Sequence, residues 1–221
     1  GGRPVLRRVV ERALRVPGLA RVLIGSPASA TSRVRELLEG LPVEFLANDL
    51  PDLPQRERLR RRRRWGGGGW QGGIGGGYVW DEEADPRALV AALRHADAEG
   101  IAVFSPSAPL VDGALAASIV DNLARPRPAT HLSYAAAPPG LAPWAVSAEL
   151  ARELAARGWS LGEWLDVERR AAGPILDAAS QQSCVGLPLS LKACAHRFTW
   201  DSAHQCAFVP RLWTALGARA E

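Results

Sequence analysis

The stretch of residues 101–124, IAVFSPSAPLVDGALAASIVDNLA, most constrains the fold of this chain. Its first four residues are apolar or β-prone, Ser105 and Pro106 interrupt them, and residues 113–124 repeat apolar side chains with a helical period. This pattern predicts a buried strand, a polar loop at its carboxyl end and a helix. Because open α/β sheets bind ligands outside the carboxyl ends of their strands, we expect residues 105–112 to border the functional site.

Strand and helix patterns alternate along most of the remaining chain. Apolar periodicity predicts helices over residues 5–16, 31–39, 86–99, 147–157 and 203–216. Short β-prone runs predict strands over residues 21–25, 43–47, 130–135 and 197–200. Ser160 and Glu163 have the spacing of a capping box, which predicts another helix start. This alternation is typical of an α/β fold, and we expect a three-layer αβα sandwich around a mainly parallel, mixed sheet.

One region breaks this rhythm. Residues 56–64 hold seven arginines, and residues 66–77 hold nine glycines. Glycine-rich segments lose much conformational entropy when they become ordered. We therefore expect a single domain over residues 1–221 that carries a flexible Arg/Gly-rich insertion at about residues 50–80.

The positive charge of the chain is concentrated in that insertion. Seven arginines and Glu57 give residues 56–64 a net charge of +6, and because the whole chain carries +4, all other residues sum to −2. Arginines beside Trp65 and Trp70 are typical of a surface that contacts nucleic acid, so an Arg-patch nucleic-acid-binding domain stays an alternative. The patch has no recognised nucleic-acid-binding motif around it, which favours a solvated helix face.

Other features bear on the compartment. No apolar run is long enough to span a membrane, and the first residues form a charged amphipathic stretch instead of a signal peptide. Three cysteines are too few, and odd in number, for a disulfide framework. These features predict a cytoplasmic protein without a membrane partner. The sequence contains no methionine, so we expect it to be part of a longer gene product.

Four short segments share a further pattern. They are residues 2–6 (GRPVL), 104–112 (FSPSAPLVD), 138–143 (PPGLAP) and 197–201 (RFTWD). Together they resemble the nucleotidyltransferase family that activates sugars and sugar acids with CTP or a related nucleotide on a GT-A-like, Rossmann-like fold. The resemblance touches most of the chain. It implies a domain that binds a nucleotide or nucleotide-sugar with Mg²⁺ and transfers a nucleotidyl group to a sugar or sugar acid.

The resemblance also implies site residues. By their positions in these segments, Gly2, Arg3, Ser105 and Ser107 would bind the nucleotide. In the family, acidic residues at two strand ends hold the divalent ion, which prefers hard oxygen ligands. Asp201 matches one of these positions and Asp112 lies near the other. No catalytic residue is assigned.

Two departures from the family pattern weaken the catalytic interpretation. Ser107 stands at the first acidic position, and a neutral hydroxyl does not replace the charge of a carboxylate at a magnesium site. Arg3 replaces the family's lysine, which keeps the positive charge but exchanges a compact ammonium for a planar guanidinium group. The rival hypothesis is therefore a catalytically degenerate binding or accessory module, served by a covalently linked or partner catalytic domain. Residues 70–76 and 138–143 also resemble the nucleotidyltransferase-like region that precedes the radical SAM core in some larger bacterial proteins.

Overall fold

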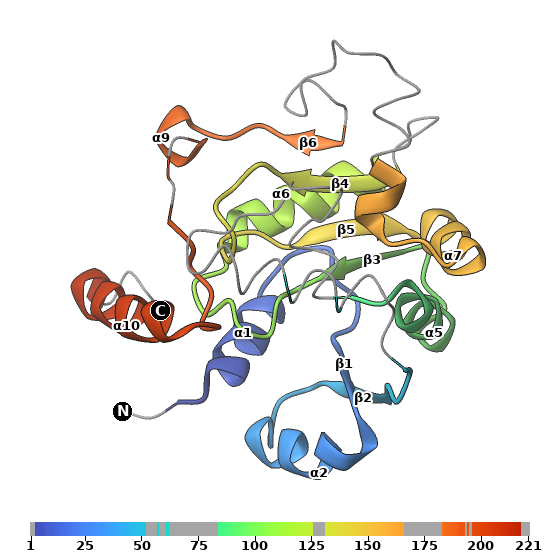
Figure 1. Cartoon of the computed structure of the whole chain (residues 1–221), viewed down its shortest axis with the longest axis horizontal. Helices are drawn as coiled ribbons and strands as arrows, with labels where there is room; N and C mark the ends of the chain where they lie inside the picture. Colours follow the sequence, from blue (N-terminus) through green and yellow to red (C-terminus); the bar gives the residue numbers. More distant parts are fainter. Residues whose placement is uncertain are drawn as a thin grey trace.

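The computed structural model describes residues 3–51, 57, 61, 84–125, 131–165, 183–192, 194 and 196–217. The predicted insertion at about residues 50–80 therefore lies almost wholly outside the described residues. The described elements follow one another along the chain as labelled in Figure 1: α1 (Val5–Ala13), β1 (Leu23–Ser26), α2 (Ala28–Leu37), β2 (Glu44–Ala47), α5 (Pro86–Ala96), β3 (Gly100–Val103), α6 (Gly113–Ala124), β4 (Leu132–Ala135), β5 (Trp144–Ser147), α7 (Ala148–Arg157), β6 (Cys184–Val185), α9 (Leu189–Lys192) and α10 (Ala203–Leu216).

Four of the described strands form one mixed sheet in the order β3-β5-β4-β6. Strand β5 runs antiparallel to both of its neighbours, whereas β4 and β6 are parallel. Strands β1 and β2 form a separate parallel pair, in which Ile24 lies opposite Phe45. The mixed α/β class expected from the sequence is confirmed, but the described four-stranded sheet is not mainly parallel, because β5 is antiparallel to both of its neighbours.

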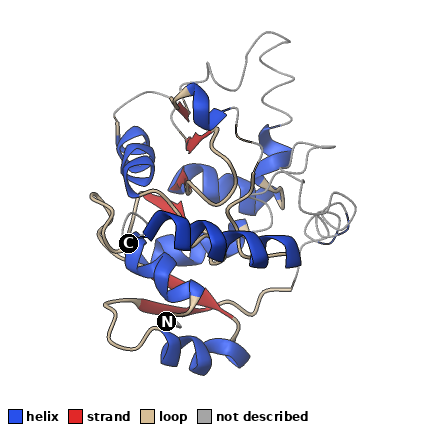
Figure 2. Cartoon of the chain, turned by 90° about the vertical axis from the view of Figure 1, so that its left-hand side faces the viewer, coloured by secondary structure: helices blue, strands red, loops and turns tan. Residues whose placement is uncertain are grey.

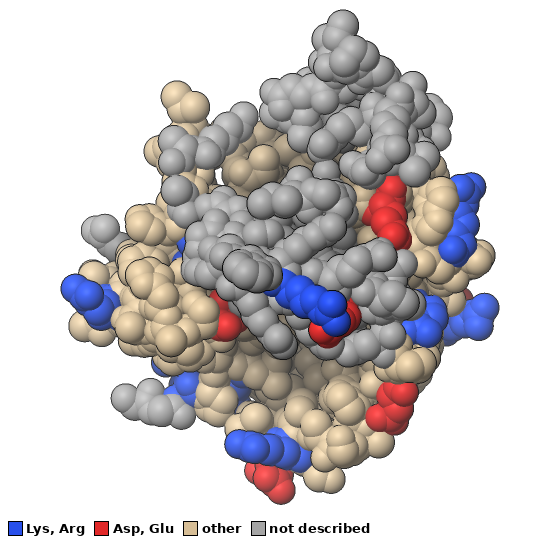
Figure 3. Space-filling model, in the orientation of Figure 1, with Lys and Arg blue, Asp and Glu red and all other residues tan. Residues whose placement is uncertain are grey.

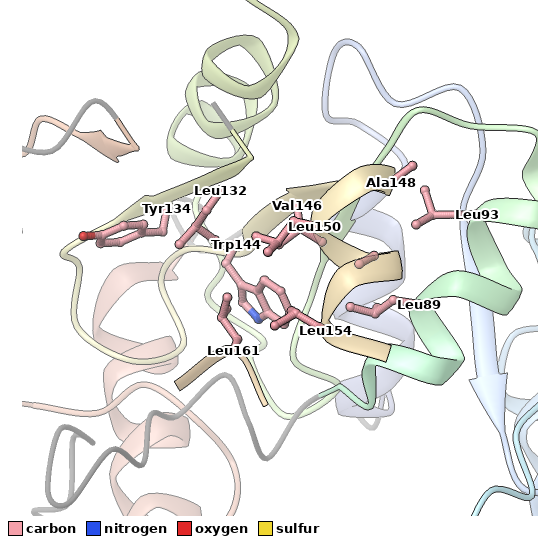
Figure 4. Close-up of a cluster of buried hydrophobic side chains, with 11 residues drawn as sticks. Leu89, Leu93, Leu132, Tyr134, Trp144, Val146, Ala148, Leu150, Leu154 and Leu161 are labelled. Carbon is pink, nitrogen blue, oxygen red and sulfur yellow. The ribbon is translucent and has the colours of Figure 1, made fainter. Parts of the chain in front are cut away.

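The side chains of β5 alternate between two helical layers, as the period of a strand requires. Trp144 and Val146 pack with residues of α5 and α7, and Ala145 packs with Ile119 of α6 on the opposite face. Figure 4 shows the larger cluster, in which leucines of α5 and α7 meet the side chains of β4 and β5. Helices thus cover both faces of this sheet, which is the predicted αβα arrangement.

Two predicted helix starts, at Ser147 and Ser160, are confirmed in detail, whereas the helix predicted to begin at residue 31 begins at Ala28. The Ser147 hydroxyl accepts a hydrogen bond from the Leu150 N–H at 3.1 Å and so caps α7. Ser160 and Glu163 form the reciprocal capping box, since each backbone N–H donates to the side chain of the other at 2.9 and 3.2 Å. No helix among the described residues is both long and apolar enough to cross a membrane.

Three strand assignments among the described residues differ from the sequence expectation. Strand β5, at the centre of the sheet, was not predicted, because only four residues separate Pro143 from the start of α7. The strand predicted at residues 197–200 is wrong, since these residues pair with loops and not with a neighbouring strand. Residues 181–195 had no predicted element, and they contribute β6 and α9.

Candidate functional site

The loop after β3 has a buried half and a more exposed half. Ala108, Leu110 and Val111 are buried, which anchors the loop in the protein interior. Ser105 and Ser107 are half-buried, and their hydroxyl oxygens lie 3.0 Å apart. The loop therefore presents two serine hydroxyls near the surface at the carboxyl end of β3.

Backbone hydrogen bonds join this loop to two distant segments. The Trp200 N–H donates to the Ser107 carbonyl at 2.6 Å, and the Asp112 N–H donates to the Leu141 carbonyl at 2.7 Å. The Phe198 N–H donates to the Pro139 carbonyl, also at 2.7 Å. Residues 105–112, 138–143 and 197–201 are thus held together, and we use the name three-segment crevice for this junction of loops. These bonds also explain why residues 197–200 form no strand, because their donors are used by loops.

Gly140 permits the backbones of residues 140 and 198 to approach each other closely. Gly140 has a φ of +92°, and a Cβ atom placed on it would lie 2.6 Å from the backbone carbon and oxygen of Phe198. Any larger residue would have to adopt an unfavourable backbone conformation and displace residues 197–200.

A buried ion pair lies at one end of the crevice. Arg197 Nη2 lies 2.8 Å from Asp201 Oδ2, and the two side chains are only 3% and 13% exposed. Arginine stays charged in proteins, so the pair neutralises the Asp201 carboxylate. Breaking such a pair is costly, because it leaves one charge buried alone.

Polar atoms beside this pair are also buried. Thr199 and Gln205 are 1% and 3% exposed. In the described part of the chain, neither Thr199 Oγ1 nor Gln205 Oε1 has a hydrogen-bond partner. Trp200, between these residues, is 38% exposed. Residues 197–201 and the start of α10 therefore combine buried polar atoms with the accessible side chain of Trp200.

The predicted site residues separate into two groups. Ser105, Ser107, Asp112 and Asp201 all lie in segments that form the crevice. Arg3, by contrast, precedes α1; its side chain is exposed, and its Nη1 lies 3.4 Å from Glu11 Oε2. Gly2 lies outside the described residues.

Arg12 of α1 contacts the crevice loop, although no sequence pattern pointed to it. Its Nη1 donates to the Val111 carbonyl at 2.8 Å. The neighbouring Arg8 lies 4.2 Å from the ring centroid of Trp213 in α10, the long helix that crosses the front of Figure 2. The apolar period of α1 marks its inner face, but no local signal distinguishes Arg12 from the other arginines of the helix.

The two predicted metal ligands already have other partners. Asp112 caps α6 through a hydrogen bond from the Leu115 N–H at 2.8 Å, and Asp201 is bound to Arg197. Over the described ranges, no group of three or more His, Cys, Asp or Glu side chains could hold a metal ion. A helix cap, an arginine-bound carboxylate and the neutral Ser107 are a donor set that does not fit magnesium, which requires several hard oxygen ligands.

Comparison with known proteins supports the fold. No protein-family model matches the chain, and no curated protein matches it in sequence. A solved structure of a cytidylyltransferase from Leptospira borgpetersenii is similar, with a TM-score of 0.62 and 11% sequence identity, covering 98% of this chain and 78% of that chain. The chain therefore shares its overall fold with this cytidylyltransferase.

Proposed function

We propose that this domain binds a nucleotide or nucleotide-sugar in the three-segment crevice and acts as a binding module. The observation that carries the proposal is the hydrogen bond from the Trp200 N–H to the Ser107 carbonyl, because it joins two loops that are distant in sequence. The crevice lies at the carboxyl end of β3, where ligands bind in open α/β sheets. The similar cytidylyltransferase fold favours a nucleotide over other anions.

The side chains at the crevice suit such a ligand. The Ser105 and Ser107 hydroxyls can donate to phosphate or ribose oxygens, since a hydroxyl both donates and accepts hydrogen bonds. The accessible Trp200 offers a surface for base stacking, which contributes about 1–3 kcal/mol per base in proteins that use it. These side chains support binding of a nucleotide and do not require that the domain catalyse nucleotidyl transfer.

We further propose that binding does not depend on Mg²⁺. The Asp201 carboxylate is neutralised by Arg197, and Ser107 supplies no negative charge. A domain that lacks these charges retains the shape of a nucleotidyltransferase but not its means of holding a catalytic metal. Transfer of a nucleotidyl group, and the sugar it would modify, would then belong to a covalently linked or partner catalytic domain, for which a radical SAM core remains one hypothesis.

The test is a calorimetric titration of the chain with CTP, UTP, GTP and ATP, each with and without Mg²⁺. We expect at least one nucleotide to bind with an affinity that Mg²⁺ changes by less than about threefold, equivalent to about 0.7 kcal/mol. Binding of none of the four would disprove the nucleotide proposal. Binding that requires Mg²⁺ would contradict the metal-independent module and favour an enzyme.

A charge substitution locates the site. Ser107→Asp places a carboxylate in the crevice and should weaken nucleotide binding by about tenfold in the absence of Mg²⁺, because like charges near a protein surface repel by about 1–4 kcal/mol. Ser118→Asp is the matched control, since Ser118 is exposed on α6. Equal weakening by both variants would show that only the net charge matters and would remove the crevice from the proposal.

A further inference from the structure

A second candidate site lies between α5 and α7. The structure contains a cavity of about 200 Å³ there that is open to solvent, lined by Val90, Leu93, Ala98 and the exposed Arg94, Asp97 and Arg152. Its position differs from that of the crevice, because Asp97 precedes the start of β3 whereas Ser105 follows its end. The cavity and the crevice therefore lie at opposite ends of the same strand.

Two arginines from different helices face this cavity. Neither Arg94 nor Arg152 makes an ion pair or side-chain hydrogen bond with any residue that the structure describes. Other arginines of the same helices are paired: Arg87 with Asp85, and Arg157 with Glu153 at 3.0 Å. Figure 3 shows basic side chains over this edge of the molecule, where α5 and α7 lie. Two unpaired guanidinium groups beside one cavity are suited to an oxyanion, which each can bind through two hydrogen bonds.

A simpler explanation for an arginine on a helix is its attraction to the negative carboxyl end of the helix dipole. Arg94 lies in the last turn of α5, where a cation is favoured by the helix dipole alone. Arg152 lies within α7, away from its last turn, so the dipole does not explain it. Both side chains line the same hollow, so one anion placed there could contact both guanidinium groups.

The third polar group of the cavity restricts the ligand further. Asp97 ends α5 in the left-handed conformation with a φ of +50°, the one positive φ of a non-glycine residue in the described chain. A carboxylate accepts hydrogen bonds and repels an anion, so it suits a hydroxyl group of the ligand. Val90, Leu93 and Ala98 supply apolar lining between the polar groups.

We propose that this cavity binds a small phosphate monoester that carries a hydroxyl group. Arg94 and Arg152 hold the phosphate, and Asp97 accepts a hydrogen bond from the hydroxyl. The volume of about 200 Å³ has room for a phosphate on a short polyol. The site is independent of the proposed nucleotide crevice.

The probes for the test are glycerol 3-phosphate and inorganic phosphate, titrated calorimetrically into the whole chain. We expect saturable binding of glycerol 3-phosphate, with lower affinity for inorganic phosphate. Arg94→Gln and Arg152→Gln should each weaken ester binding by about tenfold, because one charge-assisted hydrogen bond contributes enough for that change. Asp97→Asn should reduce the difference in affinity between the two probes.

The control is Arg157→Gln, which removes one positive charge from the end of α7 outside the cavity. It should leave ester binding unchanged within about twofold. Equal loss with Arg157→Gln, or the absence of saturable ester binding, would overturn the proposal. Equal affinity for the two probes would overturn the assignment of an ester. CTP binding should be the same in the Arg94 and Arg152 variants as in the natural chain, so a failure here is distinguishable from a failure of the nucleotide proposal.

Discussion

Gly140→Ala tests whether the close approach at Gly140 holds the three-segment crevice together. The added methyl group would lie 2.6 Å from the Phe198 carbonyl, and the backbone at residue 140 has a φ of +92°. A left-handed conformation costs a residue other than glycine about 1–2 kcal/mol. Displacing residues 197–200 would also break the Phe198 to Pro139 hydrogen bond, worth about 1 kcal/mol. We therefore expect the free energy of unfolding to fall by about 2–3 kcal/mol.

Urea denaturation followed by tryptophan fluorescence measures this change. With a slope of about 2–3 kcal/mol per molar urea, the midpoint should fall by about 1 M. Gly158→Ala is the matched control, since Gly158 has a φ of +65° but no atom within 4 Å of its added Cβ. It isolates the conformational cost, and we expect a loss of about 1 kcal/mol. If the two variants lose the same stability, the contact with Phe198 does not matter and the reasoning is refuted.

Two further substitutions examine the ion pair and the core by the same denaturation assay. Arg197→Met should destabilise the fold by about 3–5 kcal/mol, because it leaves Asp201 buried without its arginine. The double variant Arg197→Met with Asp201→Leu should recover part of this loss. If it recovers none, the two side chains are not directly coupled. Leu154→Ala, in the buried cluster between α7 and the sheet, should lower the free energy of unfolding by about 2–5 kcal/mol. Leu189→Ala, at an 80% exposed position, should change stability by less than about 0.5 kcal/mol, and a similar effect at both leucines would refute the assignment of the core.

The sequence alone determined those features that depend on neighbours along the chain. The helix periods, the Ser147 cap and the Ser160 capping box are local, because a helix bonds to itself within one turn. The position of the 105–112 loop at the end of β3 was equally local. The αβα class followed from the alternation of these segments and is supported by the similar cytidylyltransferase fold.

Only the tertiary structure decided which distant segments meet. Strand β5 is defined by partners on both sides, β3 and β4, and its four residues carry too little periodicity to predict it. Residues 197–200 have β-prone side chains, yet their N–H groups donate to loops, so the pairing partner and not the propensity set their structure. The Arg197 to Asp201 pair and the cavity between α5 and α7 arise in the same way. Burial and the convergence of charges from separate helices exist only after the chain has packed.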